Sequence, residues 1–400
     1  MTVAVRETKL GDIAEVAAGQ GAPQGASNFG SVGHPFVRAG SLDVLNGGAS
    51  EGKLERIANH IASDHGLRLF PAGTVIFAKS GMSAVKGLVY QLRQSCYVVS
   101  HLAAVVPKAV LDSSYIRHWF LAHPPSRLIN DSAYPSIRLP DIAALSIPLP
   151  SLAEQQRIAA VLDKADGIRR KRRESLRLLD EFLQSAYMYL VGQRNDDYVT
   201  WPDLSVADLA SSPEAIRTGP FGSSLRHSEF VDRGIAVLGI DNAVQNRFAW
   251  GERRFITEEK YQQFKRYTVK PGDIIITIMG TTGRSAVVPD NIPPAISTKH
   301  LAVITLDRPR VQPQYLAHAI HSDPAVLAQI SGANRGAIMS GLNLGLIKRL
   351  RLRLPPVTLQ EQFARVVAVA SSAREQLMLA GTETDRLYDS LAQRAFRGEL

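Results

Sequence analysis

Two long stretches of the chain carry apolar residues at heptad spacing, the pattern of a helix that packs along another helix. The first begins after Pro148-Leu149-Pro150, and the next proline is Pro202. Ser151 followed by Glu154 matches a capping box, which marks a helix start. The two apolar lines are Leu162, Leu176, Leu183, Leu190 and Ile158, Ala165, Leu179, Ala186. The pattern predicts a long amphipathic helix within residues 151–195.

A second stretch of the same kind closes the chain over residues 356–400. Thr358 and Glu361 are expected to open it as a capping box does, and its lines are Phe363, Ala370, Leu377, Leu391 and Val366, Ala373, Ala380, Leu387. Each apolar stripe needs a partner, and the chain must return through an intervening block before the second helix begins. We therefore predict an antiparallel coiled coil. The side chains expected to hold it together are Leu162, Leu176, Leu183, Phe363, Leu377 and Leu387.

The two remaining blocks, residues 1–150 and 196–355, have a different pattern. GTVIFAKSG (Gly73–Gly81) and GDIIITIMG (Gly272–Gly280) are short β-branched runs bounded by glycine, and AVVP and AVITL are similar. Glycine and proline interrupt most of the remaining sequence. Each block is predicted to be a mixed α/β domain with a curved sheet and many surface loops, where binding residues usually lie.

The two blocks are copies of each other. Gly73 corresponds to Gly272, and His101 corresponds to His300, at an offset of 199 residues. At the helix starts, IPLPSLAEQQRIAAVL matches LPPVTLQEQFARVVAV at an offset of 207, which places Glu154-Gln155 on Glu361-Gln362. A period of half the chain indicates two whole domains, because solenoid repeats recur every 20–50 residues.

Composition and charge narrow the classes of function. The 400 residues include 46 Lys and Arg against 37 Asp and Glu. The excess lies in the two blocks, with 13 basic and 10 acidic residues in 1–150 and 19 and 13 in 201–355. An anionic partner such as nucleic acid is therefore expected. Cys96 is the only cysteine, which excludes an internal disulfide. Without a long apolar run or a signal-like start, we expect a cytoplasmic protein that does not contact membranes.

The order domain, long helix, domain, long helix resembles the specificity subunit of type I restriction-modification enzymes, over essentially the whole chain. The motifs that carry the resemblance are IPLPSLAEQQRIAAVLDKAD at the end of the first half, and LPPVTLQEQFARVV with SLAQRAFRGEL at the end of the second. The glycine-bounded strand and loop described above occurs in both halves. The second copy departs from the first in two places: it reads QEQ for EQQ, and Met279 stands where the first has Ser80.

The resemblance implies a DNA-recognition subunit that is not itself an enzyme. Residues 1–150 and 196–355 would be target-recognition domains, each contacting one half of a bipartite double-stranded DNA sequence. The helices at 151–195 and 356–400 would set the spacing and dock two methyltransferase subunits. S-adenosylmethionine would then bind to those subunits, and ATP with Mg²⁺ to motor-nuclease restriction subunits, so this chain would hold no cofactor or metal.

Candidate DNA contacts are basic or polar residues in or beside the glycine-rich loops of the basic blocks. They are Lys79, Ser80, Lys86, Arg93, Arg284, Lys299 and Arg335. The basic run Arg169–Arg173 is instead interpreted as a subunit-docking surface or a partner for the acidic second helix (Glu375, Glu383, Asp385, Asp389). His101 and His300 are interpreted as strand-entry histidines bonded to a nearby backbone group.

The sequence gives little support for catalysis. Adenine methylation would require an Asn/Asp-Pro-Pro-aromatic motif, and the stretches 291–294 and 123–126 lack its spacing or its aromatic residue. Gly280–Ser285 lacks the lysine and glycine spacing of a phosphate-binding loop, and no HExxH pattern occurs. Two other interpretations stay open at this point: a bivalent protein-binding adaptor without DNA specificity, and an autonomous DNA enzyme of unrecognised type.

Overall fold

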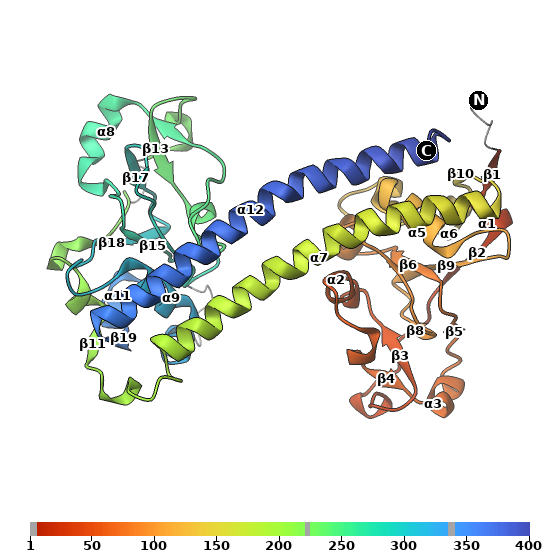
Figure 1. Ribbon diagram of the computed structural model, residues 1–400, viewed down its shortest axis with the longest axis horizontal. Helices are drawn as coiled ribbons and strands as arrows, with labels where there is room; N and C mark the ends of the chain where they lie inside the picture. Colours follow the sequence, from red (N-terminus) through yellow and green to blue (C-terminus); the bar gives the residue numbers. More distant parts are fainter. Residues whose placement is uncertain (1–5, 221–224, 335–340) are drawn as a thin grey trace. The chain divides into compact units, whose positions relative to one another are not determined.

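A computed structural model describes residues 6–220, 225–334 and 341–400 of the chain. It divides into two compact units, Met1–Arg177 with Glu375–Leu400, and Leu178–Arg374. Two long helices, α7 (Leu152–Leu190) and α12 (Val357–Phe396), pass through both units (Figure 1). Each unit therefore consists of one α/β domain and a part of each long helix, as the sequence predicts for the fold class.

The first domain contains two four-stranded sheets and a short ribbon. The first sheet has the order β2-β9-β6-β7, the second β4-β3-β8-β5, and the ribbon pairs β1 with β10. All pairings are antiparallel except the parallel pair β3 and β8. The strands are β1 (Glu7–Lys9), β2 (Ala14–Ala18), β3 (His34–Val37), β4 (Arg56–Ile57), β5 (Leu69–Phe70), β6 (Val75–Ala78), β7 (Val89–Gln91), β8 (Cys96–Val98), β9 (Leu102–Pro107) and β10 (Ser146–Pro148).

Short helices cover these sheets. Among them α5 packs on the sheet that contains β6 and β7, and its buried face includes Tyr115, Trp119 and Phe120. This face joins the core shared with the first turns of α7. The helices are α1 (Leu10–Ile13), α2 (Ser41–Asn46), α3 (Asn59–Asp64), α4 (Met82–Val85), α5 (Ser113–Ala122) and α6 (Leu139–Ala143).

The second domain repeats this arrangement. Its sheets have the orders β12-β18-β15-β16 and β14-β13-β17, its ribbon pairs β11 with β19, and β13 with β17 is the parallel pair. The strands are β11 (Asp203–Ser205), β12 (Ile216–Thr218), β13 (Ile235–Leu238), β14 (Phe255–Ile256), β15 (Ile274–Thr277), β16 (Ser285–Val287), β17 (Ala295–Ser297), β18 (Leu301–Ile304) and β19 (Arg351–Arg353). The helices are α8 (Glu258–Phe264), α9 (Pro313–Ser322), α10 (Pro324–Asn334) and α11 (Leu344–Arg349).

The strands confirm the repeat that the sequence predicts at an offset of 199. The runs after Gly73 and Gly272 form the equivalent central strands β6 and β15, and both are fully buried. Both glycines have positive φ angles, +88° and +75°, which other residues rarely adopt. The expected turn before each strand therefore depends on glycine at this position.

At the helix starts the equivalence differs from the sequence alignment. Gln155 is fully buried, and its amide donates to the carbonyls of Val110 and Pro150 and accepts from the N–H of Asp112. In the second domain the same three bonds are made by Gln360, with Arg310, Pro355 and Gln312. Gln155 therefore corresponds to Gln360 and not to Gln362, and the offset is 205 and not 207.

The two helix starts also differ in their caps. Ser151 Oγ accepts from the N–H of Glu154 at 3.3 Å, so the expected serine cap is present. Thr358 lies inside α12, which begins at Val357 directly after Pro356. The prediction that Thr358 caps the second helix is therefore wrong, because two prolines already fix the entry to the helix.

Within the first unit, α7 packs against the C-terminal part of α12. Leu162 is fully buried, and Leu176 is half-buried. From α12, Tyr388, Ala392 and Ala395 join the same core. Arg169 and Arg172 form ion pairs with Asp385, at 2.7 and 3.2 Å. The basic run on α7 therefore includes partners for the acidic second helix, one of the two roles expected for it.

Leu387 does not lie in this contact, because its side chain is 51% exposed. The buried line of α12 runs through Phe363 and Ala370, and then moves to Gly381 and Tyr388. The four-residue step from Leu377 to Gly381 breaks the strict heptad and rotates the following turns. A β-carbon at Gly381 would overlap the guanidinium of Arg172. The prediction that Leu387 holds the helices together is therefore wrong.

Within the second unit, the last turns of α7 pack against the first turns of α12. Tyr187 and Phe363 are fully buried, with ring centroids 5.7 Å apart. Arg374 forms an ion pair with Asp180, and Leu183 and Leu377 are half-buried. Positions later in α7 contact positions earlier in α12, so the pair is antiparallel, as predicted.

Candidate nucleic-acid interface

The loop after β6, residues 79–81, which we call the platform loop, is held by backbone hydrogen bonds on two sides. The N–H of Lys79 donates to the carbonyl of His101 at 2.9 Å, and the carbonyl of Lys79 accepts from Ile137 at 2.7 Å. Ser80 Oγ lies 2.8 Å from His101 Nδ1. His101 thus has a side-chain partner and not the backbone partner expected from the sequence. The loop is consequently a rigid platform, fixed between the turn before β9 and the segment before α6.

The second domain builds the same platform after β15. The N–H of Ile278 donates to the carbonyl of His300 at 3.0 Å, and its carbonyl accepts from Leu342 at 2.8 Å. Because Met279 replaces Ser80, the buried Nδ1 of His300 has no hydrogen-bond partner among the described residues. Burial, together with the charge of Lys299, lowers the pKa of His300. Met279 itself is 42% exposed.

The residues of the first domain that are predicted to contact DNA differ in how accessible their side chains are to a ligand. Lys79 and Ser80 lie in the platform loop and are half-buried, and Arg93 is exposed. Lys86 Nζ lies 2.8 Å from both carboxylate oxygens of Asp43. A phosphate would have to compete with this carboxylate, so Lys86 is the weakest of these candidates.

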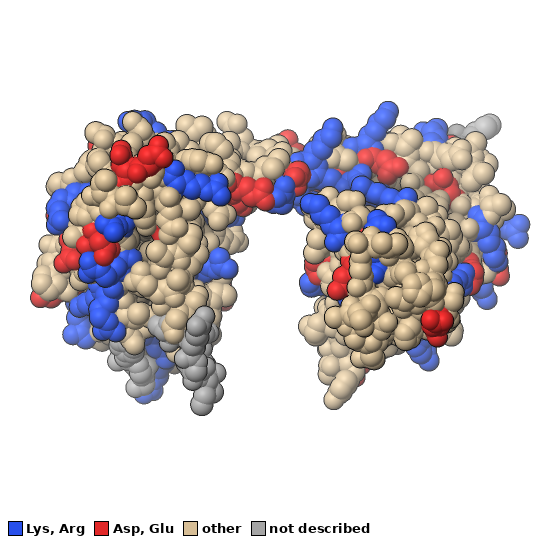
Figure 2. All heavy atoms as spheres, turned by 90° about the horizontal axis from the view of Figure 1, so that it is seen from below, with Lys and Arg blue, Asp and Glu red and all other residues tan. Residues whose placement is uncertain are grey.

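In the second domain, Arg284 is exposed and Lys299 is half-buried. Arg335 lies outside the described residues. In the view of Figure 2, the Lys and Arg side chains of the first unit, on the right, lie mostly along its upper part and outer edge, and much of the middle of that face is uncharged. Basic residues are therefore not spread evenly over this unit.

An arginine–carboxylate pair that the sequence analysis missed stands between two strands in each domain. Arg38 follows β3 and contacts Glu55, which precedes β4, with Nε 3.2 Å from Oε2. Asp241 follows β13 and accepts from Arg254, which precedes β14, at 2.6 Å. The two residue types have exchanged strands, so alignment of the two halves does not reveal the pair.

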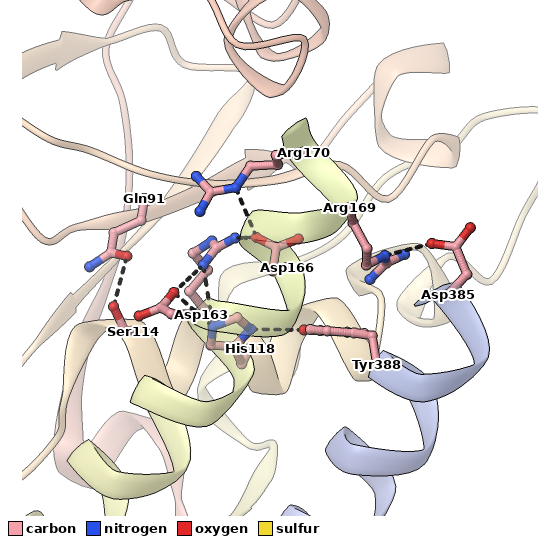
Figure 3. Close-up of polar contacts among 10 residues, drawn as sticks. Gln91, Ser114, His118, Asp163, Asp166, Arg169, Arg170, Asp385 and Tyr388 are labelled. Atoms are coloured by element: carbon pink, nitrogen blue, oxygen red, sulfur yellow. Dashed lines mark hydrogen bonds and ion pairs between the residues drawn. The ribbon is translucent and has the colours of Figure 1, made fainter. Parts of the chain in front are cut away.

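A polar cluster joins α5 to both long helices within the first unit (Figure 3). The fully buried His118 contacts Asp163 of α7 at 3.0 Å and the hydroxyl of Tyr388 of α12 at 2.8 Å. Arg117 forms ion pairs with Asp163 and Asp166. Burial lowers the pKa of His118, and the hydrogen bond from His118 lowers the pKa of Asp163. The cluster fixes the domain to the helices through charged and polar groups.

The part of the chain that the structure describes offers neither a metal site nor a membrane span. There, no three residues among His, Cys, Asp and Glu come together as ligands for a metal ion. No helix in the same residues is long and apolar enough to cross a membrane.

Fold and site together define a class of protein: a two-domain scaffold with an internal repeat, in which matched loop platforms are attached to an antiparallel helix pair. Comparison with known proteins is consistent with this class. Residues 3–178 match the family described as "Type I restriction modification DNA specificity domain".

Several relatives resemble the chain over longer stretches. It is 25% identical to the type I restriction enzyme EcoBI specificity subunit of Escherichia coli, over 64% of this chain and 58% of that protein. It is 23% identical to the StySPI specificity subunit of Salmonella potsdam, over 92% of this chain and 82% of that one. The crystal structure of the type I restriction-modification S subunit from M. genitalium has the same fold, with a TM-score of 0.57 at 12% identity, covering 98% and 96% of the two chains.

Residues 3–178 thus match the type I restriction modification DNA specificity domain, and over longer stretches the chain is similar to specificity subunits of type I restriction enzymes. The match to the E. coli relative spans 58% of that protein's length.

Proposed function

We propose that this chain is a DNA-recognition scaffold in which each domain contacts one half of a bipartite double-stranded target. The observation that carries the proposal is the structural repeat. Both domains have a four-stranded sheet and a second sheet built around one parallel pair, and an equivalent buried glutamine, Gln155 or Gln360, attaches each domain to a long helix. On this common frame the platform loops carry different side chains, Ser80 in one and Met279 in the other. Two domains with the same backbone fold but different loop side chains are suited to contact DNA in the same manner while they recognise different half-sites.

Affinity and sequence choice would come from different side chains. Exposed arginines such as Arg93 and Arg284 would contact phosphates, and their loss would weaken binding to every sequence. Side chains that reach base edges in the major groove would provide specificity. The platform loops are suited to this because their backbone is already fixed, which limits the entropy lost on binding.

The helices would set the separation of the half-sites and dock two methyltransferase subunits. Large apolar side chains on α7 and α12 support docking, because they remain exposed although each helix already packs against the other. Phe182 is 55% exposed, Val369 72% and Leu379 67%. A contiguous patch of such side chains would be a protein-binding region.

The chemistry would then belong to other chains. Methyltransferase subunits would bind S-adenosylmethionine, and motor-nuclease restriction subunits would bind ATP with Mg²⁺. This chain would hold neither cofactor and would act in the cytoplasm as part of the assembled complex.

Methylation assays with S-adenosylmethionine test this proposal. The chain alone should be inactive, and the chain mixed with its methyltransferase subunit should methylate a bipartite motif. Activity of the chain alone would indicate an autonomous enzyme. If the mixture methylated DNA without any motif that depends on this chain, the protein-binding adaptor would be the better interpretation.

A further inference from the structure

We infer that Arg38 in the first domain and Arg254 in the second are base-reading groups, each directed at the O6 and N7 edge of a guanine in the major groove. The inference rests on the proposed function, because it concerns how the two domains distinguish sequences. It assigns the reading to residues outside the loop positions that the sequence indicates.

In the second domain the arginine is positioned by a carboxylate. Arg254 Nη2 donates to Asp241 Oδ1 at 2.6 Å, and Glu252 lies 3.9 Å from Nε. The side chain of Arg254 is 24% exposed. It lines an open pocket of about 510 Å³ together with Ile240, Val244, Gly280 and Thr281. The guanidinium is therefore both held in place and accessible from a concave surface beside the platform loop.

In the first domain the guanidinium comes from the opposite strand. Arg38 Nε donates to Glu55 Oε2 at 3.2 Å, and its Cζ lies 4.7 Å from the ring centroid of Phe29 and 5.2 Å from that of Phe36. A stacked, carboxylate-bound guanidinium keeps few rotamers, while its remaining N–H groups are available to a ligand. The side chain is 42% exposed.

The backbone shows that Glu55 and Arg254 occupy equivalent positions in the two domains. The carbonyl of Glu55 accepts from Phe36 at 2.8 Å, and the carbonyl of Arg254 accepts from Val237 at 2.9 Å. Arg38 thus corresponds to Gly239, and a β-carbon at Gly239 would lie 2.9 Å from Arg254 Nη1. The guanidinium of Arg254 therefore takes the place where the side chain of Arg38 begins. Each domain therefore has an arginine–carboxylate pair at this end of the two strands, although the arginine comes from different strands.

The pair of the second domain adjoins its platform loop, and the pair of the first domain is followed by a helix that contacts the segment after its loop. In the first domain, α2 follows Arg38, and its Asp43 binds Lys86 at the end of α4. In the second, the Cδ1 atom of Ile240 lies 3.8 Å from the place of a β-carbon at Gly280. In the second domain, Arg254 and Gly280 of the platform loop thus line the same pocket.

The chemistry favours guanine over phosphate as the ligand. A neighbouring carboxylate repels a phosphate, whereas a guanine edge presents two neutral acceptors that match the guanidinium fork. Exposed ion pairs contribute little to stability. A role in the fold alone therefore gives no reason for each domain to keep an arginine–carboxylate pair here while the arginine changes strand.

The test is methylation-motif sequencing of the complete complex with Arg254→Gln or Arg38→Gln. Arg254→Gln should reduce the preference for guanine at one position of one half-site by roughly 5- to 150-fold, the range for a lost bidentate contact. The other half-site should be unchanged, which shows that the variant folds and assembles. Arg38→Gln should reduce the preference for guanine at one position of the other half-site, and it should leave the half-site read through Arg254 unchanged.

Arg253→Gln is the matched control, because it removes the same charge from the adjacent exposed residue, whose Cζ lies 5.1 Å from the ring centroid of Trp250. It should lower methylation evenly and leave the motif unchanged. The inference is overturned if the Arg254 and Arg38 variants methylate the wild-type motif with unchanged base preference. Failure of the proposed function would look different, since the wild-type complex would then have no motif that depends on this chain.

Discussion

Gln155 and Gln360 are the residues that most clearly tie each domain to its helix. Each side-chain amide satisfies one backbone N–H and two carbonyls in a region closed to water. A buried backbone group without a partner is costly, so one amide stabilises two segments of the chain at once, the loop before α5 or α9 and the residues just before the long helix. Tyr115 supports the same junction, because its hydroxyl donates to the carbonyl of Pro148 at 2.6 Å.

Substitution of this glutamine should therefore destabilise the first unit. We expect Gln155→Ala to cost about 1–3 kcal/mol for each buried group left without a partner. Denaturant unfolding followed by hydrogen exchange at residues 110–112 would measure the effect. The adjacent Gln156 is exposed, so Gln156→Ala should be nearly neutral. Equal stabilities for the two variants would contradict the role given to Gln155.

The salt dependence of DNA binding should distinguish basic side chains that contact phosphates from basic side chains that are already held in ion pairs. Arg284→Ala should reduce the slope of log affinity against log salt by about one, since one phosphate contact would be lost. Lys86→Ala should change the slope less, because Lys86 is already paired with Asp43. Binding measurements on the complex at several salt concentrations would compare them. A larger change for Lys86 than for Arg284 would show that the ion pair opens on DNA.

Between elements, charged groups and not only apolar ones determine how α5 and α12 pack on α7. Asp166 is almost fully buried and is surrounded by Arg117 and Arg170. Breaking such a cluster by removing one partner leaves a buried charge without compensation, which is strongly destabilising. The cluster therefore favours one packing arrangement of these three helices.

The neutral form of His118 gives this cluster a defined pH dependence. Because burial lowers its pKa below the ordinary 6.5, the unfolded chain binds a proton first as the pH falls. Stability is thus complete above about pH 6.5 and is lost below it, by at most about 1.4 kcal/mol per pH unit for one proton. The groups around the ring are Arg117, Asp163, Asp166 and Tyr388.

Thermal unfolding at pH 7.5, 6.5 and 5.5 would test this prediction. We expect His118→Gln to melt lower than wild type at pH 7.5, and the gap to narrow as the pH falls to 5.5. His318 and His321 also have lowered pKa values through burial and remain in both proteins, so only the difference between the curves is informative. A gap that stays constant with pH would mean that His118 does not titrate in the unfolding reaction.

For the whole molecule, the proposed function makes helix length and half-site sequence separable properties. We expect insertion of one heptad into α7 after Glu174, with a matching heptad in α12 after Gly381, to add about 10 Å of helix while keeping the apolar phase. The unspecified gap in the methylated motif should grow by about three base pairs. The bases within each half-site should stay the same.

Motif sequencing of the complex would check this, with an insertion into α7 alone as the control. That control shifts one stripe against the other and should abolish activity. An active complex with both insertions and an unchanged gap would show that the helices do not set the spacing.

The sequence by itself determined the elements and their repetition. Heptad positions such as Leu162 and Phe363, and the glycine-bounded runs that become β6 and β15, follow from local periodicity, which depends on residues close together in the chain. The two-domain organisation followed from the internal repeat for the same reason. Hydrophobic spacing carries this information because burial acts on whole faces of an element.

Only the tertiary structure decided which side chains meet. Tyr388 is buried in place of Leu387 because a four-residue step rotates the last turns of α12. Gln155 corresponds to Gln360, and not to the residue that the sequence alignment gives, because the buried backbone groups that the amide binds define the junction. Lys86 is paired with Asp43, and Arg254 with Asp241, which are contacts that no local sequence pattern reveals. Hydrogen bonds and ion pairs act over about 3 Å between specific atoms, so they are fixed only once the chain is folded.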